Sequence, residues 1–161
     1  MADYPGFITI ETGEDDALPL AIAWALPDGQ IKHTLIQPDD AWLNDELLKL
    51  GDYSLEELRT FGVSPLDVIR ELEGDHFSAT LFTAGVFDDE AGLSRLFDDY
   101  GVDPFVELAP AESLYPDLAT GEWARARNEL FGELGLEPLR PDHEVQVMLY
   151  LHQRLIEDAA S

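Results

Sequence analysis

The first third of the chain alternates short apolar runs with turn-forming residues, a pattern typical of β-strands. Three of these runs predict strands, over residues 7–11, 20–26 and 31–36. Between the second and third runs, Pro27-Asp28-Gly29 predicts a tight turn, because proline fixes φ and glycine accepts a positive φ. We therefore expect the second and third strands to form an antiparallel hairpin.

After Pro38 the apolar positions follow helical periods. Ser54 begins a capping box that predicts one helix start, and Ser64-Pro65 predicts another. From Asp88 onward, apolar residues recur at the spacing i, i+3, i+4, i+7, which marks one face of a third helix: Leu93, Leu96, Phe97 and Tyr100. Later segments, around 123–134 and 142–157, predict further helices.

Two more apolar runs, over 77–83 and 104–108, predict strands between these helices. No internal repeat and no linker rich in Gly, Pro or Ser divides the chain. We therefore expect one α/β domain over residues 1–161, with a mixed five-stranded sheet and helices on both faces. A cleft is expected beside the first strand.

The chain is strongly acidic. It has 34 Asp and Glu against 9 Lys and Arg, which leaves a net charge of −25 over 161 residues. This charge repels phosphate backbones and anionic lipids, so it excludes a broad nucleic-acid surface and adsorption to membranes. Only Lys32 and Lys49 are lysines, and an acidic, lysine-poor surface suits a salt-rich cytoplasm. A surface that binds a basic protein would also be acidic, and the sequence leaves both interpretations open.

The chain has no cysteine, which excludes disulfides, thiolate metal sites and a cysteine nucleophile and agrees with a reducing compartment. Its first residues show no basic stretch ahead of an apolar one, and no uncharged run reaches the ~18 residues that span a bilayer. We expect a cytoplasmic protein without a membrane partner.

Three candidate functional residues stand at the ends of predicted elements. Glu11 lies in Thr9-Ile10-Glu11-Thr12-Gly13 at the end of the first strand, Asp88 follows Phe87 before a helix, and His143 opens the last helix. In this order the chain resembles the DEDDh family of 3′-to-5′ exonucleases, which share the ribonuclease H-like fold, over about 7–155. The resemblance implies that Glu11 and Asp88 hold Mg²⁺ or Mn²⁺, that His143 is the general base, and that the substrate is a single-stranded nucleic acid end.

Two positions depart from the family pattern. The first motif of the family begins with Asp where this chain has Thr9, and the third places Asp five residues after the histidine, where this chain has Met148. A neutral hydroxyl and a thioether are poor ligands for two hard cations. We therefore expect an exonuclease-like protein whose catalysis is lost or strongly reduced, which leaves open whether it is an enzyme. The alternative is a non-enzymatic module that binds a basic protein.

Other residues could change this picture. Five further acidic residues could replace the missing ligands: Glu14, Asp15, Asp16, Asp89 and Asp142. The candidate residues also have structural interpretations, since Asp88 could cap a helix, Glu11 could simply end a strand, and His143 could be a solvated polar residue. His152 repeats the five-residue spacing with Glu157, but it fits the inner face of the last helix and is expected to be a partly buried packing residue.

Overall fold

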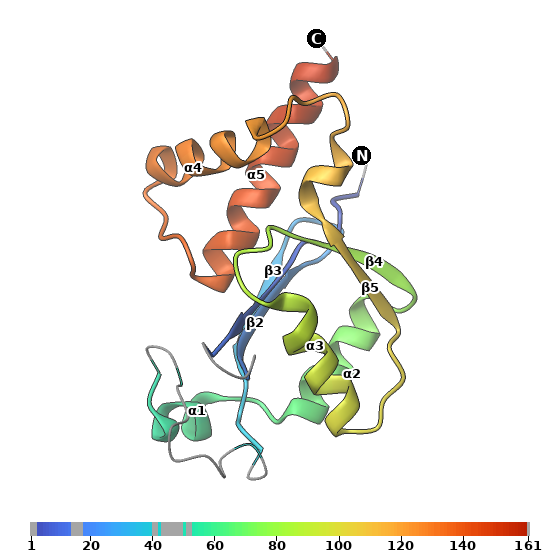
Figure 1. The fold of residues 1–161 in the computed structure, drawn as a ribbon, viewed down its shortest axis with the longest axis vertical. Coiled ribbons are helices and arrows are strands. Elements are labelled where there is room, and N and C mark those ends of the chain that lie inside the picture. The colour runs from blue at the N-terminus through green and yellow to red at the C-terminus, as the bar shows by residue number, and fades with distance from the viewer. Residues whose placement is uncertain (1–2, 14–17, 40–41, 43–49, 51–52, 161) are drawn as a thin grey trace.

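A computed structural model describes residues 3–13, 18–39, 42, 50 and 53–160 (Figure 1). Its strands are β1 (Ile8–Thr12), β2 (Pro19–Ala25), β3 (Ile31–Leu35), β4 (Ala79–Thr83) and β5 (Val106–Pro110). Its helices are α1 (Leu55–Phe61), α2 (Pro65–Asp75), α3 (Asp89–Asp99), α4 (Glu122–Leu134) and α5 (Pro141–Ala160), with the short 3₁₀ helix η2 (Ala111–Leu114) after β5. The predicted mixed α/β class is confirmed.

The first three strands form an antiparallel sheet in the order β1-β2-β3. β2 and β3 form the predicted hairpin: the amide of Gly29 donates to the carbonyl of Leu26 at 2.9 Å, and Gly29 adopts a φ of +90°. That backbone conformation is open to glycine without strain. On its other side β2 pairs with β1, with Ile22 opposite Ile10.

The last two strands form a second, parallel sheet, β4-β5, with Leu81 opposite Leu108. A parallel bridge between Phe7 and Phe82 connects the two sheets, and here the amide of Phe82 donates to the carbonyl of Gly6 at 2.9 Å. A Cβ at Gly6 would lie 2.5 Å from Cδ2 of the buried Leu81, so a larger residue here would force that side chain to shift. The predicted strands are therefore paired as two sheets that touch at one bridge.

The helix starts follow the predicted signals. Ser54 accepts a hydrogen bond from the amide of Glu57 at 3.0 Å, and Ser64 accepts one from the amide of Asp67 at 3.3 Å, ahead of Pro65 in the first turn of α2. These bonds satisfy amide groups that a helix leaves unpaired at its start. No helix in the described ranges is both long and apolar enough to cross a membrane.

Helices cover both faces of the first sheet (Figure 1). Ile8 and Ile10 of β1 pack in a cluster with residues of α2 and α3. Phe7 packs in a second cluster with residues of α4 and α5. Because successive side chains of a strand point to opposite faces, each helical layer receives alternate residues of β1.

Candidate functional site

The candidate site lies on the face of the first sheet that α5 covers. Phe7 packs against α5, so alternation along β1 places Thr9 and Glu11 on the same face. Opposite them on β2 are Ala23 and Ala21. These small side chains leave room for α5 to pack closely over the two positions that resemble the first motif.

Glu11 is half-buried near the end of β1, and its carboxylate is already bound. The hydroxyl of Tyr53 donates to Glu11 Oε1 at 2.7 Å. Burial, together with this hydrogen bond, raises the pKa of Tyr53 above its usual value, so the phenol stays protonated and remains a donor. The predicted metal ligand thus has one oxygen committed to a protein hydrogen bond.

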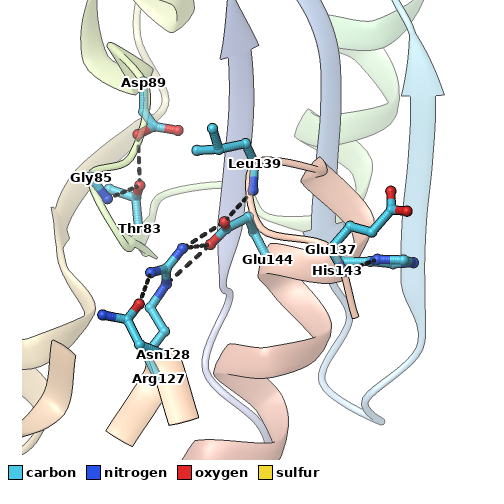
Figure 2. Close-up of polar contacts among 9 residues, drawn as sticks. All are labelled: Thr83, Gly85, Asp89, Arg127, Asn128, Glu137, Leu139, His143 and Glu144. Atoms are coloured by element: carbon cyan, nitrogen blue, oxygen red, sulfur yellow. Dashed lines mark hydrogen bonds and ion pairs between the residues drawn. The ribbon is translucent and has the colours of Figure 1, made fainter. Parts of the chain in front are cut away.

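At the start of α3 the structure separates two adjacent carboxylates. Asp88 is exposed and makes no capping hydrogen bond, whereas Asp89 is 3% exposed. Asp89 Oδ1 accepts from the amide of Ile10 on β1 at 2.8 Å. Its Oδ2 accepts from the hydroxyl of Thr83 on β4 at 2.8 Å, as Figure 2 shows. The fold therefore brings Asp89, rather than the predicted Asp88, to β1.

Asp89 links the two sheets just beyond the bridge at Phe7. There its carboxylate, instead of a β4 carbonyl, accepts the hydrogen bond of the Ile10 amide. Burial raises the pKa of Asp89 to about 6, opposed by the hydrogen bonds from Ile10 and Thr83 and supported by repulsion from Glu144. This linking carboxyl group therefore titrates in the mildly acidic range.

His143 lies in the first turn of α5 and accepts a backbone hydrogen bond. The amide of Glu137 donates to Nδ1 of His143 at 3.0 Å. An amide can only donate, so the neutral ring carries its proton on Nε2, which lies 4.0 Å from Asp142 Oδ2. In this arrangement Nδ1 of His143 accepts from a backbone amide.

Asp142 places the start of α5 over the middle of the first sheet. Its Oδ1 accepts from Nε of Arg140 at 3.0 Å, and its Oδ2 lies 3.9 Å from Nδ1 of His33 on β3. His33 stands opposite Ala23, which in turn stands opposite Thr9. Burial lowers the pKa of His33, which favours its neutral form.

A buried ion pair joins α4 to α5, and sequence analysis did not predict it. Nη2 of Arg127 donates to both carboxylate oxygens of Glu144, at 2.5 and 2.6 Å, and the amide of Leu139 donates to Oε2 at 2.8 Å (Figure 2). Glu144 is 0% exposed. Because two charges lose water here, these several hydrogen bonds are needed to offset the desolvation cost.

One sequence signal could have marked both Asp89 and Glu144 as buried carboxylates. Asp89 is four residues before Leu93 and seven before Leu96, and so it falls on the apolar face of α3. Glu144 has the same spacing to Met148 and Leu151 on α5. An acidic residue in phase with the apolar face of a helix is expected to be buried and to need a partner.

The two positions that depart from the family motifs are both buried. Thr9 is 1% exposed, and its hydroxyl has no hydrogen-bond partner among the described residues. Met148 is 1% exposed and belongs to the apolar cluster that includes residues of α4 and α5. A buried hydroxyl left unpaired costs about 1–3 kcal/mol, so Thr9 lowers the stability of β1 without supplying a charge.

His152 has the packing role predicted for it. It is half-buried, with its ring edge-on to Phe7 at 5.9 Å, and the Tyr115 hydroxyl lies 2.7 Å from its Nδ1. Burial lowers the pKa of His152 and raises that of Tyr115, so both groups are neutral near pH 7.

Glu11, Asp88 and His143 do not form a group that could hold a metal ion. Nowhere in the described ranges do three His, Cys, Asp or Glu side chains lie close enough together for that. The donor chemistry agrees, because Thr9 and Met148 stand where the family pattern has carboxylates and supply no charged oxygen. The described residues therefore do not fit the two-cation site that the family resemblance implies.

Of the acidic residues named as substitutes, the two that the structure describes do not change this result. Asp89 is held between the two sheets and Asp142 is bound by Arg140. Residues 14–16, the other three candidates, lie outside the described residues. A hollow of about 260 Å³ between the start of α3 and the ends of β4 and β5 is lined by Asp88 and Asp89, but by neither Glu11 nor His143.

Neither a scan against protein-family models nor a search of curated proteins finds a match for this chain. The chemistry of the site is therefore inferred from its own geometry. Each charged group near β1 is bound by another group of the protein: Glu11 by Tyr53, Asp89 by Ile10 and Thr83, Glu144 by Arg127. Such an arrangement holds the strands and helices together. Among the described residues it offers no cluster of three possible metal ligands.

Proposed function

We propose that the chain is a ribonuclease H-like domain derived from DEDDh 3′-to-5′ exonucleases, and that its metal-dependent catalysis has been lost or strongly reduced. The main support for this proposal is the order in which the strands are connected. Counted through the bridge between Phe7 and Phe82, the strands follow one mixed order, β3-β2-β1-β4-β5. The helix α5 covers β1, β2 and β3 on one face, and α3 follows β4 and packs on the other.

The chain order of the three motif residues also supports this ancestry. Glu11 comes near the end of β1, Asp88 just before α3, and His143 in the first turn of α5. In an active ancestor the two carboxylates would have held Mg²⁺ or Mn²⁺, and the histidine would have activated water at the 3′ end of a single strand. These roles come from the family resemblance alone.

The contacts of this chain favour loss of that chemistry. Thr9 and Met148 supply no charge, Glu11 is bound by Tyr53, and the ring lone pair of His143 is bound by a backbone amide. A net charge of −25 also repels the phosphate backbone of any substrate. A protein with these features is better suited to a role that does not require phosphodiester hydrolysis.

A nuclease assay tests the proposal directly. Single-stranded DNA and short RNA, each labelled at the 5′ end, are incubated with the protein in Mg²⁺ and in Mn²⁺ and resolved by length. We expect no metal-dependent shortening beyond that of the matched Glu11→Gln variant. Robust shortening by the wild type that is lost in Glu11→Gln would show that catalysis survives.

A rescue experiment tests the ancestry separately. The double substitution Thr9→Asp with Met148→Asp restores both missing carboxylates, and the neutral control is Thr9→Asn with Met148→Asn. Both positions are 1% exposed, so thermal melting must first show which variants fold. We expect calorimetric titration to detect Mn²⁺ binding by the folded Asp variant but not by the Asn control. A folded Asp variant that binds no more Mn²⁺ than its control would contradict the assignment of the motifs.

A further inference from the structure

β5 is an outer strand with one open edge. It pairs with β4 on one side, and no other segment of the described chain makes a backbone hydrogen bond to residues 106–109. A strand edge of this kind presents N–H and C=O groups that can pair with an added strand. Pro104 and Pro110 lie at its two ends, so the open edge has room for about five residues.

The outer strand of the other sheet, β3, is protected in a way that β5 is not. Lys32 on β3 makes ion pairs with Glu71 and Asp75 of α2, at 3.0 and 2.8 Å. Beyond the end of β3, Ile36 forms a bridge with Val63. A lysine on an edge strand is a common device against unwanted strand pairing, and β5 contains no lysine.

A groove with an apolar floor follows β5 on the side of α3. It measures about 390 Å³, and its floor includes the buried side chains of Leu93, Phe97 and Val106. Glu90 of α3 and Glu107 of β5 are exposed carboxylates in its lining. Alternate side chains of an added strand could therefore enter an apolar groove whose rim is acidic.

The hollows around β5 share one sign of charge. A second hollow, of about 440 Å³, lies at the starts of β4 and β5, and the hollow of about 260 Å³ lies at their ends. Together with the α3 groove, their linings hold Asp88, Asp89, Glu90 and Glu107, and none of the described residues that line them is Lys, Arg or His. This charge favours a cationic partner and repels a nucleic acid or an acidic peptide.

An exposed aromatic pair stands just before β5. Phe77 is 67% exposed, and its ring stacks on that of Phe105 with centroids 6.2 Å apart. Phe105 in turn packs edge-on against Phe97, at 5.0 Å. Aromatic residues are enriched among those that contribute most to protein interfaces, so this pair supplies an apolar anchor beside the open edge.

We propose that the open edge of β5 binds an extended basic segment of another protein, which adds to the second sheet as a strand. Apolar side chains of that segment would enter the groove beside α3. Glu107, next to Val106 in the lining of that groove, would meet Lys or Arg of the partner. The proposal does not depend on the exonuclease ancestry.

The first test uses two short fluorescein-labelled peptides, one in which lysine alternates with valine and one in which glutamate replaces every lysine. Fluorescence anisotropy should show that the wild-type protein binds the lysine peptide at least about tenfold more tightly. Hydrogen exchange should slow at the amides of residues 106–109 when the lysine peptide is bound. Binding without slower exchange at β5, or no preference for lysine, would overturn the proposal.

Matched charge reversals separate this site from the acidity of the whole chain. Glu90→Lys with Glu107→Lys changes the groove, and Glu73→Lys with Glu129→Lys makes the same charge change at exposed positions of α2 and α4. We expect the groove variant to bind the lysine peptide about tenfold more weakly and the control to change affinity less than about twofold. Equal weakening would show binding by net charge alone. Self-association through β5, detected by sedimentation, would assign the edge to a second copy and also overturn the proposal.

Discussion

Replacing Asp89 with asparagine removes a buried charge from the connection between the two sheets while keeping the shape of the side chain. The carboxyl group titrates near 3.8 in an unperturbed chain and at about 6 in the fold, because burial raises its pKa. Between these pH values the folded state holds more protons than the unfolded state, so the free energy of unfolding falls as pH rises. Burial of the ionised group therefore destabilises the protein most above the folded pKa.

The size of this effect follows from the pKa difference. One pKa unit corresponds to about 1.36 kcal/mol, and the pKa of Asp89 rises by roughly two units on folding. Ionisation of Asp89 therefore lowers the free energy of unfolding by about 3 kcal/mol at pH 7.5, but by only about 1.6 kcal/mol at pH 5. Asparagine does not ionise, and its carbonyl can still accept from the amide of Ile10. Its hydrogen bonds are weaker than those of a carboxylate, so Asp89→Asn gains less stability at any one pH than these values. The free energy of unfolding of Asp89→Asn, relative to that of the wild type, should still rise by about 1.4 kcal/mol between pH 5 and pH 7.5.

Urea unfolding, followed by the fluorescence of the three tryptophans, measures this difference at both pH values. The control is Asp88→Asn, at an exposed position one residue away, for which we expect a change within about 0.5 kcal/mol. A free-energy difference between wild type and Asp89→Asn that is equal at pH 5 and pH 7.5 would refute the reasoning, because it would mean that folding does not change the titration of Asp89.

Three further predictions concern stability. Arg127→Met should lower the free energy of unfolding, measured in urea, by about 3–5 kcal/mol, because it leaves Glu144 charged and buried without its partner. Adding Glu144→Met should recover much of that loss. A loss below about 1 kcal/mol in Arg127→Met would contradict this prediction. Thr9→Val should stabilise the fold by about 1 kcal/mol, because it removes a buried hydroxyl that has no hydrogen-bond partner in the described structure. A melting temperature lower than that of the wild type would show that the hydroxyl makes a hydrogen bond. Raising NaCl from tens of millimolar to about 1 M should raise the melting temperature by several degrees, because salt screens repulsion among a net 25 negative charges. A melting temperature that stays constant or falls would show that the charges are paired or spread widely enough to be tolerated.

The sequence alone determined where the strands and α-helices of the described chain lie to within a few residues, but it did not predict the 3₁₀ helix η2. Pro27-Asp28-Gly29 predicted the hairpin, and Ser54 and Ser64 predicted two helix starts, each of which the structure confirms through a local hydrogen bond. The runs over 77–83 and 104–108 predicted β4 and β5, although both strands begin two residues later than predicted. These signals succeed because turns, caps and periodicity depend on interactions within a few residues along the chain.

Only the tertiary structure decided which charged groups meet and which are already bound. Asp89 reaches an amide 79 positions away on β1, and Arg127 reaches Glu144 from a neighbouring helix. Motif spacing selected Asp88 and His143, but it contained nothing about the direction of Asp89 or the backbone amide that binds His143. Helical phase marks a carboxylate as buried, whereas the identity of its partner depends on how helices and strands pack at long sequence separation, where no local preference operates.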